Sequence, residues 1–515
     1  MSENGRLDPV TLSVLASALA GVAEEMGAVL IRGAYSSNIK ERRDCSTAIF
    51  DAEGRMVAQA EHIPVHLGAM PEAVAAVMRR DPRPGDVFAI NDPYSGGTHL
   101  PDITLVSPIS YEDDILGFAV TRAHHSDVGG MRPGSMPSDS REVYQEGIII
   151  PPVRLVQGGE YVQDILDLLL ANVRTPAIRR GDLRAQIAAN NIAEERIAEL
   201  IERRSKETVL TAFDEVISYA EKRTREAVRE LPDGEYSAED VVEGDGIVDE
   251  DIQIKATVTV ENDSMIIDFS GTADAARGNV NCPLPVTRSA CYFALRVLLP
   301  KDILANAGTY APLEIKTPEG SLVNAKSPSA VVAGNVETSN RIADAVLAAF
   351  ASFAPEEVPA QGQGTINNTI IGGPGWTYYE TIGGGQGASS KGPGPSGVHV
   401  GMSNTLNTPI EAFELEYPMR VERYELLYES GGAGEHRGGD GIARSVRVLE
   451  PASLSLLTDR RRYPPRGANG GEPGAVGENL LNEEELPPKV SRELEEGDVV
   501  TVRTPGGGGY GQRVE

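Results

Sequence analysis

The stretch of sequence that decides the fold is residues 87–106, VFAINDPYSGGTHLPDITLV. It contains two short apolar runs, at 87–90 and 103–106, joined by a segment rich in Gly, Pro, Asn and Asp. Short apolar runs bounded by such residues are typical of strands that end in loops. The stretch therefore predicts two strands and a connecting loop, and that loop carries the polar side chains of His99 and Asp102.

The same texture extends on both sides, from about residue 44 to residue 170. Apolar runs at 48–50 and 118–120 predict further strands, and residues 71–80 predict a short helix. Before this region, Asp8 and Pro9 are residue types that favour the start of a helix. Apolar residues then recur at spacings of three and four as far as Gly33, so we expect a helix with one apolar face.

The rest of the chain divides by its patterns into a helical part and parts rich in strands. Residues 181–231 are strongly helical, the alternating runs within 252–269 predict a hairpin, and 286–299 and 337–354 predict helices. We therefore predict a mixed α/β (α+β), multidomain fold. Its expected parts are an α/β metal-bearing region at 1–180, a helical segment at 181–232, a mixed region with the hairpin at 233–360, and a Gly-rich, β-rich region at 361–515.

The charge of the chain limits its partners. The 515 residues include 76 Asp and Glu but 47 Lys and Arg, which gives a net charge of −29. Such a surface repels phosphate backbones and anionic lipids, so we expect neither nucleic acid nor a membrane as a partner. Only nine of the basic residues are Lys. This fits a high-salt cytoplasm or, more simply, an acidic protein from a GC-rich genome.

The cysteines and the apolar runs indicate a cytoplasmic location. The three cysteines form no CxxC pair and are too few for a disulfide framework. The first residues do not resemble a signal peptide, and the apolar stretch 12–23 is followed at once by Glu24 and Glu25. We therefore expect no membrane-spanning segment.

Histidines concentrate in one part of the chain. Five of the seven lie between residues 62 and 125. His99 and Asp102 share the loop described above, and His124 follows a predicted strand. Two imidazoles and a carboxylate suit Zn, Fe or Mn and leave a position open for water or substrate. Asp44 is a candidate further ligand. Three other residues are candidates for supporting the ligands or for acting as the general base: His125, Asp127 and Asp92. The alternative is that these histidines are structural or surface groups.

Other motifs allow a functional and a simpler interpretation. The Gly-rich stretches 383–387 and 506–511 could hold an anion, although we interpret them mainly as tight turns. Cys282 could be a nucleophile or, more simply, a buried thiol. Glu142 and Glu146 could be acid–base groups or solvated side chains. Four arginines could bind a carboxylate or phosphate, with surface salt bridges as the simpler interpretation: Arg341, Arg437, Arg460 and Arg466.

Several of these motifs together resemble those of the hydantoinase B/oxoprolinase family. The resemblance is carried by RRDCS at 42–46, NDPY at 91–94, GTHLPD at 97–102, AHHSDVGG at 123–130 and PGSM at 133–136. Further matching motifs are EGI at 146–148, PP at 151–152, GNVN at 278–281 and RGGDG at 437–441. The family includes B-type chains of N-methylhydantoinases, the matching half of 5-oxoprolinase, caprolactamase, and components of acetone and acetophenone carboxylases.

The resemblance implies an ATP-dependent enzyme built from two kinds of chain. A hydantoinase A-type partner binds ATP and Mg and phosphorylates the substrate, and the B-type chain carries Zn or Mn. The absence of a dinucleotide or P-loop fingerprint in this sequence agrees with that division. The family metal site falls on His99, Asp102 and His124, with Asp44 as a less certain ligand. Asp127 or His125 would accept the proton of the attacking water.

The activity expected from the resemblance is hydrolysis of a cyclic amide C–N bond in a small lactam or hydantoin, by a hetero-oligomer. The alternative within the family is a component of a ketone carboxylase. The alternative of another class is a non-catalytic scaffold that positions the A-type partner. The sequence does not identify the substrate.

Overall fold

The two apolar runs of residues 87–106 form neighbouring strands in a computed structural model, which describes residues 6–513. Strand β3 (Val87–Ile90) pairs antiparallel with β4 (Asp102–Tyr111), and β4 pairs antiparallel with β5 (Asp114–His124). In this register Asp102 lies directly opposite His124. Opposite residues of an antiparallel pair project from the same face of the sheet, so the register alone places these two side chains together.

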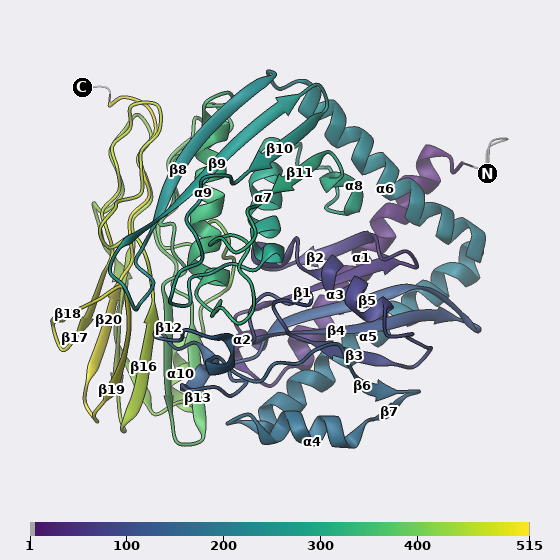
Figure 1. Ribbon diagram of the computed structural model, residues 1–515, viewed down its shortest axis with the longest axis horizontal. Helices are drawn as coiled ribbons and strands as arrows, with labels where there is room; N and C mark the ends of the chain where they lie inside the picture. Colours follow the sequence, from purple (N-terminus) through teal and green to yellow (C-terminus); the bar gives the residue numbers. More distant parts are fainter. Residues whose placement is uncertain (1–5, 514–515) are drawn as a thin grey trace.

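These strands are the centre of a seven-stranded sheet with the order β2-β1-β5-β4-β3-β6-β7 (Figure 1). The remaining strands are β1 (Cys45–Asp51), β2 (Met56–Glu61), β6 (Val153–Gln157) and β7 (Glu160–Tyr161). The short helices of this region are α2 (Ser37–Lys40), α3 (Met70–Met78) and α4 (Gln163–Ala171). Helix α3 confirms the helix predicted at 71–80.

Two long helices cover one face of this sheet. They are α1 (Pro9–Gly33) and α5 (Pro176–Arg204), and their apolar side chains form a cluster with Ala119 and Ala123 of β5. Asp8 accepts hydrogen bonds from the first backbone N–H groups of α1, as the sequence predicted. By length and composition α1 would also suffice to cross a membrane, contrary to the expectation from the sequence. Here its apolar face packs against α5 and β2. The cytoplasmic location stays a prediction.

The opposite face of the sheet packs on the middle of the chain. Phe118 and Val120 of β5 join an apolar cluster that extends through helices α7 (Leu284–Leu298) and α9 (Ser339–Ala351). A second sheet, β11-β10-β9-β8, packs against α9. Its strands are β8 (Gly234–Glu243), β9 (Asp251–Glu261), β10 (Ser264–Asp268) and β11 (Leu313–Lys316). The pairing of β9 with β10 confirms the predicted hairpin.

The helical segment predicted at 181–232 corresponds to most of α5 and to α6 (Lys206–Arg229). A short helix, α8 (Ala307–Tyr310), packs on α6. The apolar cluster of the middle region takes residues from all four of the predicted parts. The division at 180, 232 and 360 stays a prediction, whereas the mixed α/β, multidomain class is confirmed.

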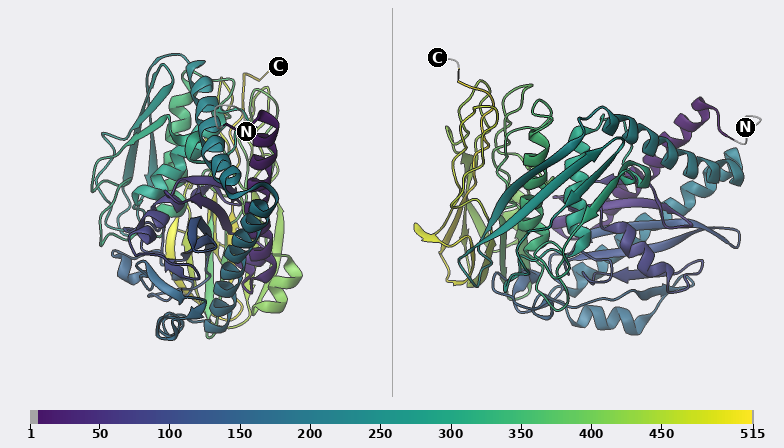
Figure 2. Two further views of the ribbon diagram at one scale, coloured as in Figure 1. Left: turned by 90° about the vertical axis from the view of Figure 1, so that its right-hand side faces the viewer. Right: turned by 45° about the horizontal axis from the view of Figure 1, so that its top comes forward.

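The C-terminal part forms two sheets that pack face to face at one end of the molecule (Figures 1 and 2). One has the order β13-β12-β16-β19 and the other β14-β15-β20-β17-β18. The strands of the first are β12 (Asn368–Gly373), β13 (Trp376–Glu380), β16 (Ala452–Leu457) and β19 (Lys489–Leu494). The second comprises β14 (Met419–Leu426), β15 (Ile442–Val448), β17 (Glu478–Leu481), β18 (Glu484–Leu486) and β20 (Val499–Arg503), and helix α10 (Ile410–Glu416) precedes it.

The Gly-rich stretches are not tight turns, and the interpretation made from the sequence is wrong. Gly506 to Gly509 are extended, and the backbone N–H groups of Gly507, Gly508 and Gly509 donate to Gly439, Gln361 and Glu472 in three different segments. We call these packed extended segments the glycine-rich bundle; its segments are 360–364, 384–388, 394–397, 431–441, 465–475 and 505–511. A Cβ atom on Gly507 would lie 2.1 Å from the carbonyl oxygen of Gln386. The segments therefore pack this closely only because they lack side chains.

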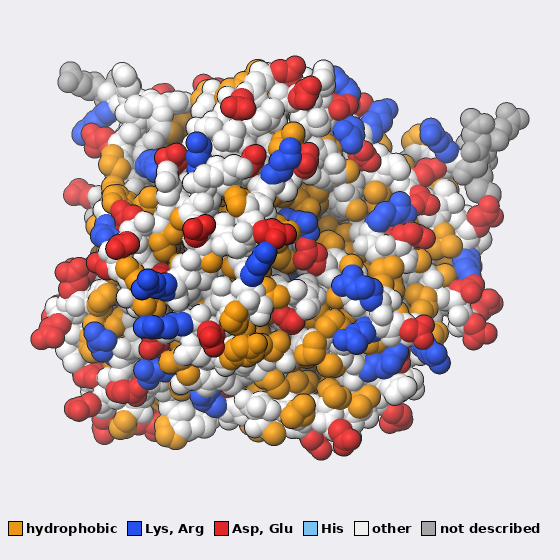
Figure 3. Space-filling view, in the orientation of Figure 1, with side chains coloured by type: hydrophobic (Ala, Val, Ile, Leu, Met, Phe, Trp, Pro, Cys, Tyr) orange, Lys and Arg blue, Asp and Glu red, His pale blue; other side chains and the backbone are white. Residues whose placement is uncertain are grey.

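The surface carries charge of both signs. On the face shown in Figure 3, acidic side chains are interspersed with Lys and Arg, and no broad basic area is seen on that face. Many of the acidic groups pair with arginines, as Glu25 does with Arg196. On this face the negative charge is thus spread out rather than gathered at one site.

Replacing Gly507 by Ala tests the packing of the glycine-rich bundle. The added methyl group collides with backbone atoms that cannot rotate away, so we expect a loss of about 1–3 kcal/mol or more in the free energy of unfolding. Thermal unfolding measures it. Gly21→Ala is the control, because nothing lies within 4 Å of a Cβ atom at that exposed helical position. An unchanged melting temperature for Gly507→Ala would contradict this account.

Candidate metal centre

Three side chains converge at the point where β4 and β5 meet. His99 Nε2 lies 3.1 Å from Asp102 Oδ1, His124 Nδ1 lies 3.4 Å from the same oxygen, and the two nitrogen atoms are 3.2 Å apart. All three side chains are buried. Among residues 6–513 this is the group of His, Cys, Asp and Glu whose donor atoms lie close enough together to hold one metal ion. The trio predicted from the sequence is therefore brought together.

The loop between β3 and β4 places His99 by folding back on itself. The Asn91 side chain donates to the backbone of Leu100 and Ile148 and accepts from Ile150. Gly97 allows the close approach, since a Cβ atom there would lie 2.2 Å from the carbonyl oxygen of Asn91. The loop ends in a turn, in which the Asp102 N–H donates to the carbonyl of His99 at 3.1 Å. The spacing of three residues thus becomes a direct contact.

The electrostatics of the trio favour the protonation states that metal ligands need. Burial lowers the pKa of His124 to about 3, so this imidazole is neutral. Burial alone would raise the pKa of Asp102, but His99 and His66 outweigh it and hold that pKa well below its usual value. Burial would likewise lower the pKa of His99, but Asp102 outweighs it and raises it. While no metal is bound, Asp102 is therefore ionised, His124 is neutral, and the Asp102 carboxylate stabilises the cationic form of His99.

The donor set fits a divalent metal ion. A tetrahedral ion with bonds of about 2.1 Å has ligand–ligand edges of about 3.4 Å, and the three contacts measured here are 3.1–3.4 Å. The remote Nδ1 of His99 donates to the carbonyl of Val332 at 3.4 Å, which leaves Nε2 free to face the other ligands. Two imidazole nitrogens and a carboxylate oxygen suit Zn, Mn or Fe.

Two neighbours of Asp102 were not assigned a role from the sequence. His66 lies at the end of a single 3-10 turn (Pro64–His66), with Nε2 3.4 Å from Asp102 Oδ2 and Nδ1 hydrogen-bonded to Ser46 Oγ at 3.0 Å. Asn335 donates to Asp102 Oδ2 at 3.5 Å from the π-helical segment Gly334–Thr338 that precedes α9. His66 was visible as one of the five clustered histidines, whereas no local pattern marks Asn335.

The C-terminal part of the chain supplies one wall of the centre. The ring of Tyr379 stacks on His124, with centroids 4.4 Å apart and planes at 17°. Tyr379 Oη donates to Asn368 Oδ1 at 2.8 Å, and Asn368 Nδ2 donates to Glu337 Oε1 at 2.8 Å. The buried guanidinium of Arg42 lies 5.1 Å from the Tyr379 ring centroid and donates to the Tyr379 carbonyl. Tyr379 is thus fixed from both ends against the imidazole.

Asp44 lies near the trio but is not part of the group of converging donors. Its backbone carbonyl accepts from the His124 N–H at 3.0 Å, and its carboxyl group is buried. Burial and the neighbouring charge of Asp102 raise the pKa of Asp44 to about 7. Its role as a further ligand stays a prediction.

His125 and Asp127 are not brought to the trio, so their expected role as general base loses its geometric support. Successive residues of a strand point to opposite faces, and His125 Nε2 donates to Gln186 of α5 at 2.9 Å, on the other face from His124. Asp127 accepts hydrogen bonds from the backbone of Gly129, Gly134 and Arg174 and is a structural anchor of its loop. Asp92 likewise accepts from Tyr94 and Ser95 within its own turn.

The remaining candidates have structural surroundings. Cys282 is buried and donates to the carbonyl of Gly334, and burial raises the pKa of its thiol, so it is not a thiolate nucleophile. Glu146 is buried and binds the backbone N–H groups of Val331 and Val332, whereas Glu142 is exposed. Arg437 pairs with Asp440 near the surface. Arg341 and Arg460 are buried in an ion-pair network, which corrects the expectation of surface salt bridges.

The fold and this centre define a class: a mixed α/β protein with a buried candidate metal site built from two histidines and a carboxylate. The chain belongs to the hydantoinase B/oxoprolinase family, whose model matches residues 8–513. It is 38% identical to 5-oxoprolinase 1 of Arabidopsis thaliana over 98% of this chain and 42% of that protein. It is 34% identical to a putative B-type chain of a D-/L-hydantoinase from Pseudomonas sp. (strain NS671) over 99% of this chain and 91% of that protein.

Solved structures show the same fold. The ATP-dependent caprolactamase from Pseudomonas jessenii superposes with a TM-score of 0.90 at 30% identity, covering 98% of this chain and 91% of that one. An acetone carboxylase structure superposes with a TM-score of 0.89 at 18% identity, covering 98% of this chain and 76% of that one, and at this identity it shows the fold alone. The chain spans about two fifths of the length of the 5-oxoprolinases that it matches.

Replacing Tyr379 tests whether the stacked ring supports the centre. Leu removes the flat face that orients the His124 imidazole, so we expect Tyr379→Leu to bind Zn or Mn about 10–100-fold more weakly. Tyr379→Phe keeps the ring and should stay close to the wild-type affinity. Competition with a chromogenic chelator measures both. Equal affinities for the Leu variant and the wild type would refute the role of the ring.

The carboxyl group of Glu337 makes stability depend on pH. Burial and the nearby charge of Asp459 raise its pKa from 4.5 to about 7, so the folded protein binds this proton more tightly than the unfolded chain. Its contribution is full below pH 4.5 and is lost as the pH rises through about 7. Glu337→Gln cannot titrate, so we expect the variant to lose less stability than the wild type between about pH 5.5 and pH 8.

Denaturant unfolding at the two pH values, without added metal, measures this difference. Groups that titrate in both proteins cancel in the comparison. The same pH dependence in both proteins would show that Glu337 is ionised throughout the range.

Proposed function

We propose that this chain is the metal-bearing component of an ATP-dependent cyclic amidase, which opens the ring of a lactam or hydantoin after a partner has phosphorylated the amide oxygen. The buried convergence of His99, Asp102 and His124 is the observation that carries the proposal. Similarity to a caprolactamase, to 5-oxoprolinases and to a hydantoinase chain supports the choice of substrate class.

The chemistry explains why ATP and a metal-ligating site belong together. An amide carbonyl is a poor electrophile, and phosphorylation of its oxygen makes the ring carbon reactive. Water adds to that carbon, the ring C–N bond breaks, the nitrogen takes a proton, and an acyl phosphate remains. A second water releases phosphate and leaves the open carboxylate. A divalent ion held by the trio, Zn or Mn, would supply Lewis-acid activation of water or of the phosphorylated oxygen.

The chain's own residues supply orientation. Val332 and Tyr379 fix the two imidazoles, as described above. His66 Nε2 lies 3.4 Å from Asp102 Oδ2, and the ionised carboxylate favours a proton on this nitrogen, so His66 holds Asp102 in place. His125 and Asp127 lie away from the trio, so neither they nor His66 are assigned the proton of the attacking water.

The partner is proposed from the lengths of the relatives. This chain matches nearly the whole of a hydantoinase B-type chain but about two fifths of the 5-oxoprolinases. We therefore assign ATP and Mg to a separate hydantoinase A-type chain in a hetero-oligomer. The ketone-carboxylase alternative rests on likeness of fold alone. The scaffold alternative leaves the three buried, converging donors without a purpose.

Reconstitution with an A-type partner tests the function. The complex should consume ATP and open the ring of at least one of 5-oxoproline, hydantoin or caprolactam, with the product measured by chromatography. His99→Ala removes one ligand, so ring opening should fall by at least about 100-fold. His436→Ala, which changes a histidine far from the trio in sequence and in the fold, is the control. Full ring opening by the His99 variant would exclude the trio as the active centre.

A further inference from the structure

A second cavity lies apart from the trio, between helix α9 and the glycine-rich bundle. Its volume is about 470 Å³, which suits a small organic ligand. One wall is apolar and includes Phe293 and Val297 of α7 and Leu347 and Ala351 of α9. The opposite wall is formed by segments of the glycine-rich bundle. The proposed reaction gives this cavity no role.

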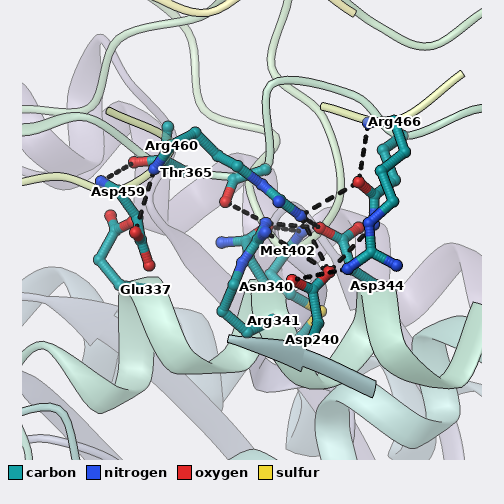
Figure 4. A network of polar contacts seen from close by, with 12 residues as sticks. Asp240, Glu337, Asn340, Arg341, Asp344, Thr365, Met402, Asp459, Arg460 and Arg466 are labelled. Carbon is teal, nitrogen blue, oxygen red and sulfur yellow. Dashed lines mark hydrogen bonds and ion pairs between the residues drawn. The ribbon is translucent and has the colours of Figure 1, made fainter. Parts of the chain in front are cut away.

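Asp344 lines the cavity and belongs to a buried ion-pair network in which the acidic groups are already neutralised (Figure 4). Asp344 Oδ2 lies 2.5 Å from a guanidinium nitrogen of Arg341 and 2.8 Å from one of Arg460. Asp240 Oδ2 is 3.0 Å from Arg460. Because both arginines are buried next to Asp344, this carboxylate presents little uncompensated negative charge to the cavity.

Arg466 is the cation that faces the cavity. Its backbone N–H donates to Gln361 Oε1 at 2.9 Å, which fixes the start of the side chain. Its Nη2 lies 3.5 Å from Asp240 Oδ1 and donates to the Glu239 carbonyl at 3.3 Å, and the other oxygen of Asp240 already serves Arg460. The Arg466 side chain is 55% exposed. Among the described residues Nε and Nη1 have no hydrogen-bond partner, so these N–H groups and the positive charge can serve an anionic group, and guanidinium groups bind carboxylates in a bidentate way.

Gln386 offers a second, neutral contact in the same cavity. Its side-chain amide has no hydrogen-bond partner among the described residues. The main chains of Gln386 and Arg466 pack against the consecutive residues Gly507 and Gly508, so they belong to neighbouring segments of the bundle. A primary amide offers both a donor and an acceptor, which is the complement of the N–H and C=O of a ring amide.

We propose that this cavity binds a small cyclic amide that carries a carboxylate, with Arg466 pairing with the carboxylate and Gln386 with the ring amide. The ring carbons lie against the apolar wall of α7 and α9. The proposal rests on the proposed function for its ligand class, and it makes Arg466 the residue that distinguishes carboxylated from uncharged rings.

The position of the cavity relates it to the metal centre. Asn340 lines its inner end and donates to the carbonyl of Val336, next to Asn335, which contacts Asp102. Asn340 also accepts a hydrogen bond from the Met402 N–H. Met402 directly follows Val400 and Gly401, which line the cavity, so this hydrogen bond closes the same end of it. The cavity and the trio thus lie on two sides of the first turns of α9, and the cavity is a holding site distinct from the reacting centre.

Binding to the full chain without ATP tests the proposal. The probes are 5-oxoproline and 2-pyrrolidinone, which is the same ring without the carboxylate, and titration calorimetry or ligand-observed NMR measures the affinities. We expect 5-oxoproline to bind more tightly. Arg466→Gln should weaken the affinity for 5-oxoproline about tenfold and leave the affinity for 2-pyrrolidinone unchanged. Arg462→Gln is the matched control, because Arg462 pairs with Asp249 and Asp251 outside the cavity.

Filling the cavity gives an independent variant. Leu347→Trp should abolish binding of both probes, with thermal unfolding to confirm that the variant is folded; Ala348→Met replaces it if it is not. Unchanged 5-oxoproline affinity in Arg466→Gln, or in a folded variant with a filled cavity, would overturn the proposal. Measurements in the His99→Ala background separate the two hypotheses, because the cavity should still bind there even if the trio proves not to be catalytic.

Discussion

The antiparallel pairing of β4 with β5 is the constraint on which the candidate centre depends. In that register Asp102 faces His124, and the preceding loop ends at the same residue, which brings His99 to the pair. A shift of one residue would turn His124 to the opposite face of the sheet, because side chains alternate along a strand. The apolar residues of β5 prevent such a shift. Phe118 and Val120 belong to one apolar core and Ala119 and Ala123 to another. A shift of one residue in either direction would therefore turn the large side chains toward the core that holds the alanines, and the alanines toward the core that holds the large side chains.

The centre is assembled from distant parts of the chain although its ligands lie within 26 residues of one another in sequence. The His99 ring is oriented by Val332, Asp102 is contacted by Asn335, and His124 is covered by Tyr379. These contacts bury an ionised carboxylate in the interior of the protein. Such a group is stable there only when opposite charge and hydrogen bonds surround it, and the enclosure in turn strengthens every electrostatic interaction within the site. The middle and C-terminal parts therefore belong to the site as much as the sheet that bears the ligands.

Sequence reasoning found the ligands because their signals are local, and failed where the determining contact is not. The spacing of His99 and Asp102 in a Gly- and Pro-rich loop, and His124 at the end of a strand, indicated the trio, and the capping by Asp8 indicated the first helix. The roles suggested for His125 and Asp127 ignored the alternation of side chains at the end of β5. Asn335 and Tyr379 carry no local mark, since their importance comes only from tertiary packing. The glycines at 506–511 were misinterpreted because the same composition serves a turn and a close-packed extended segment.

The order of segments in the glycine-rich bundle has a consequence for biosynthesis. Residues 505–511 lie among segments that all precede them in the chain, and they supply backbone partners to several of these segments. During translation the earlier segments emerge from the ribosome long before the one that holds them together. They have few side chains with which to form an interim core of their own. The bundle can therefore close only after residues 505–511 have been synthesised, whereas the sheet that bears His99, Asp102 and His124 is complete far earlier.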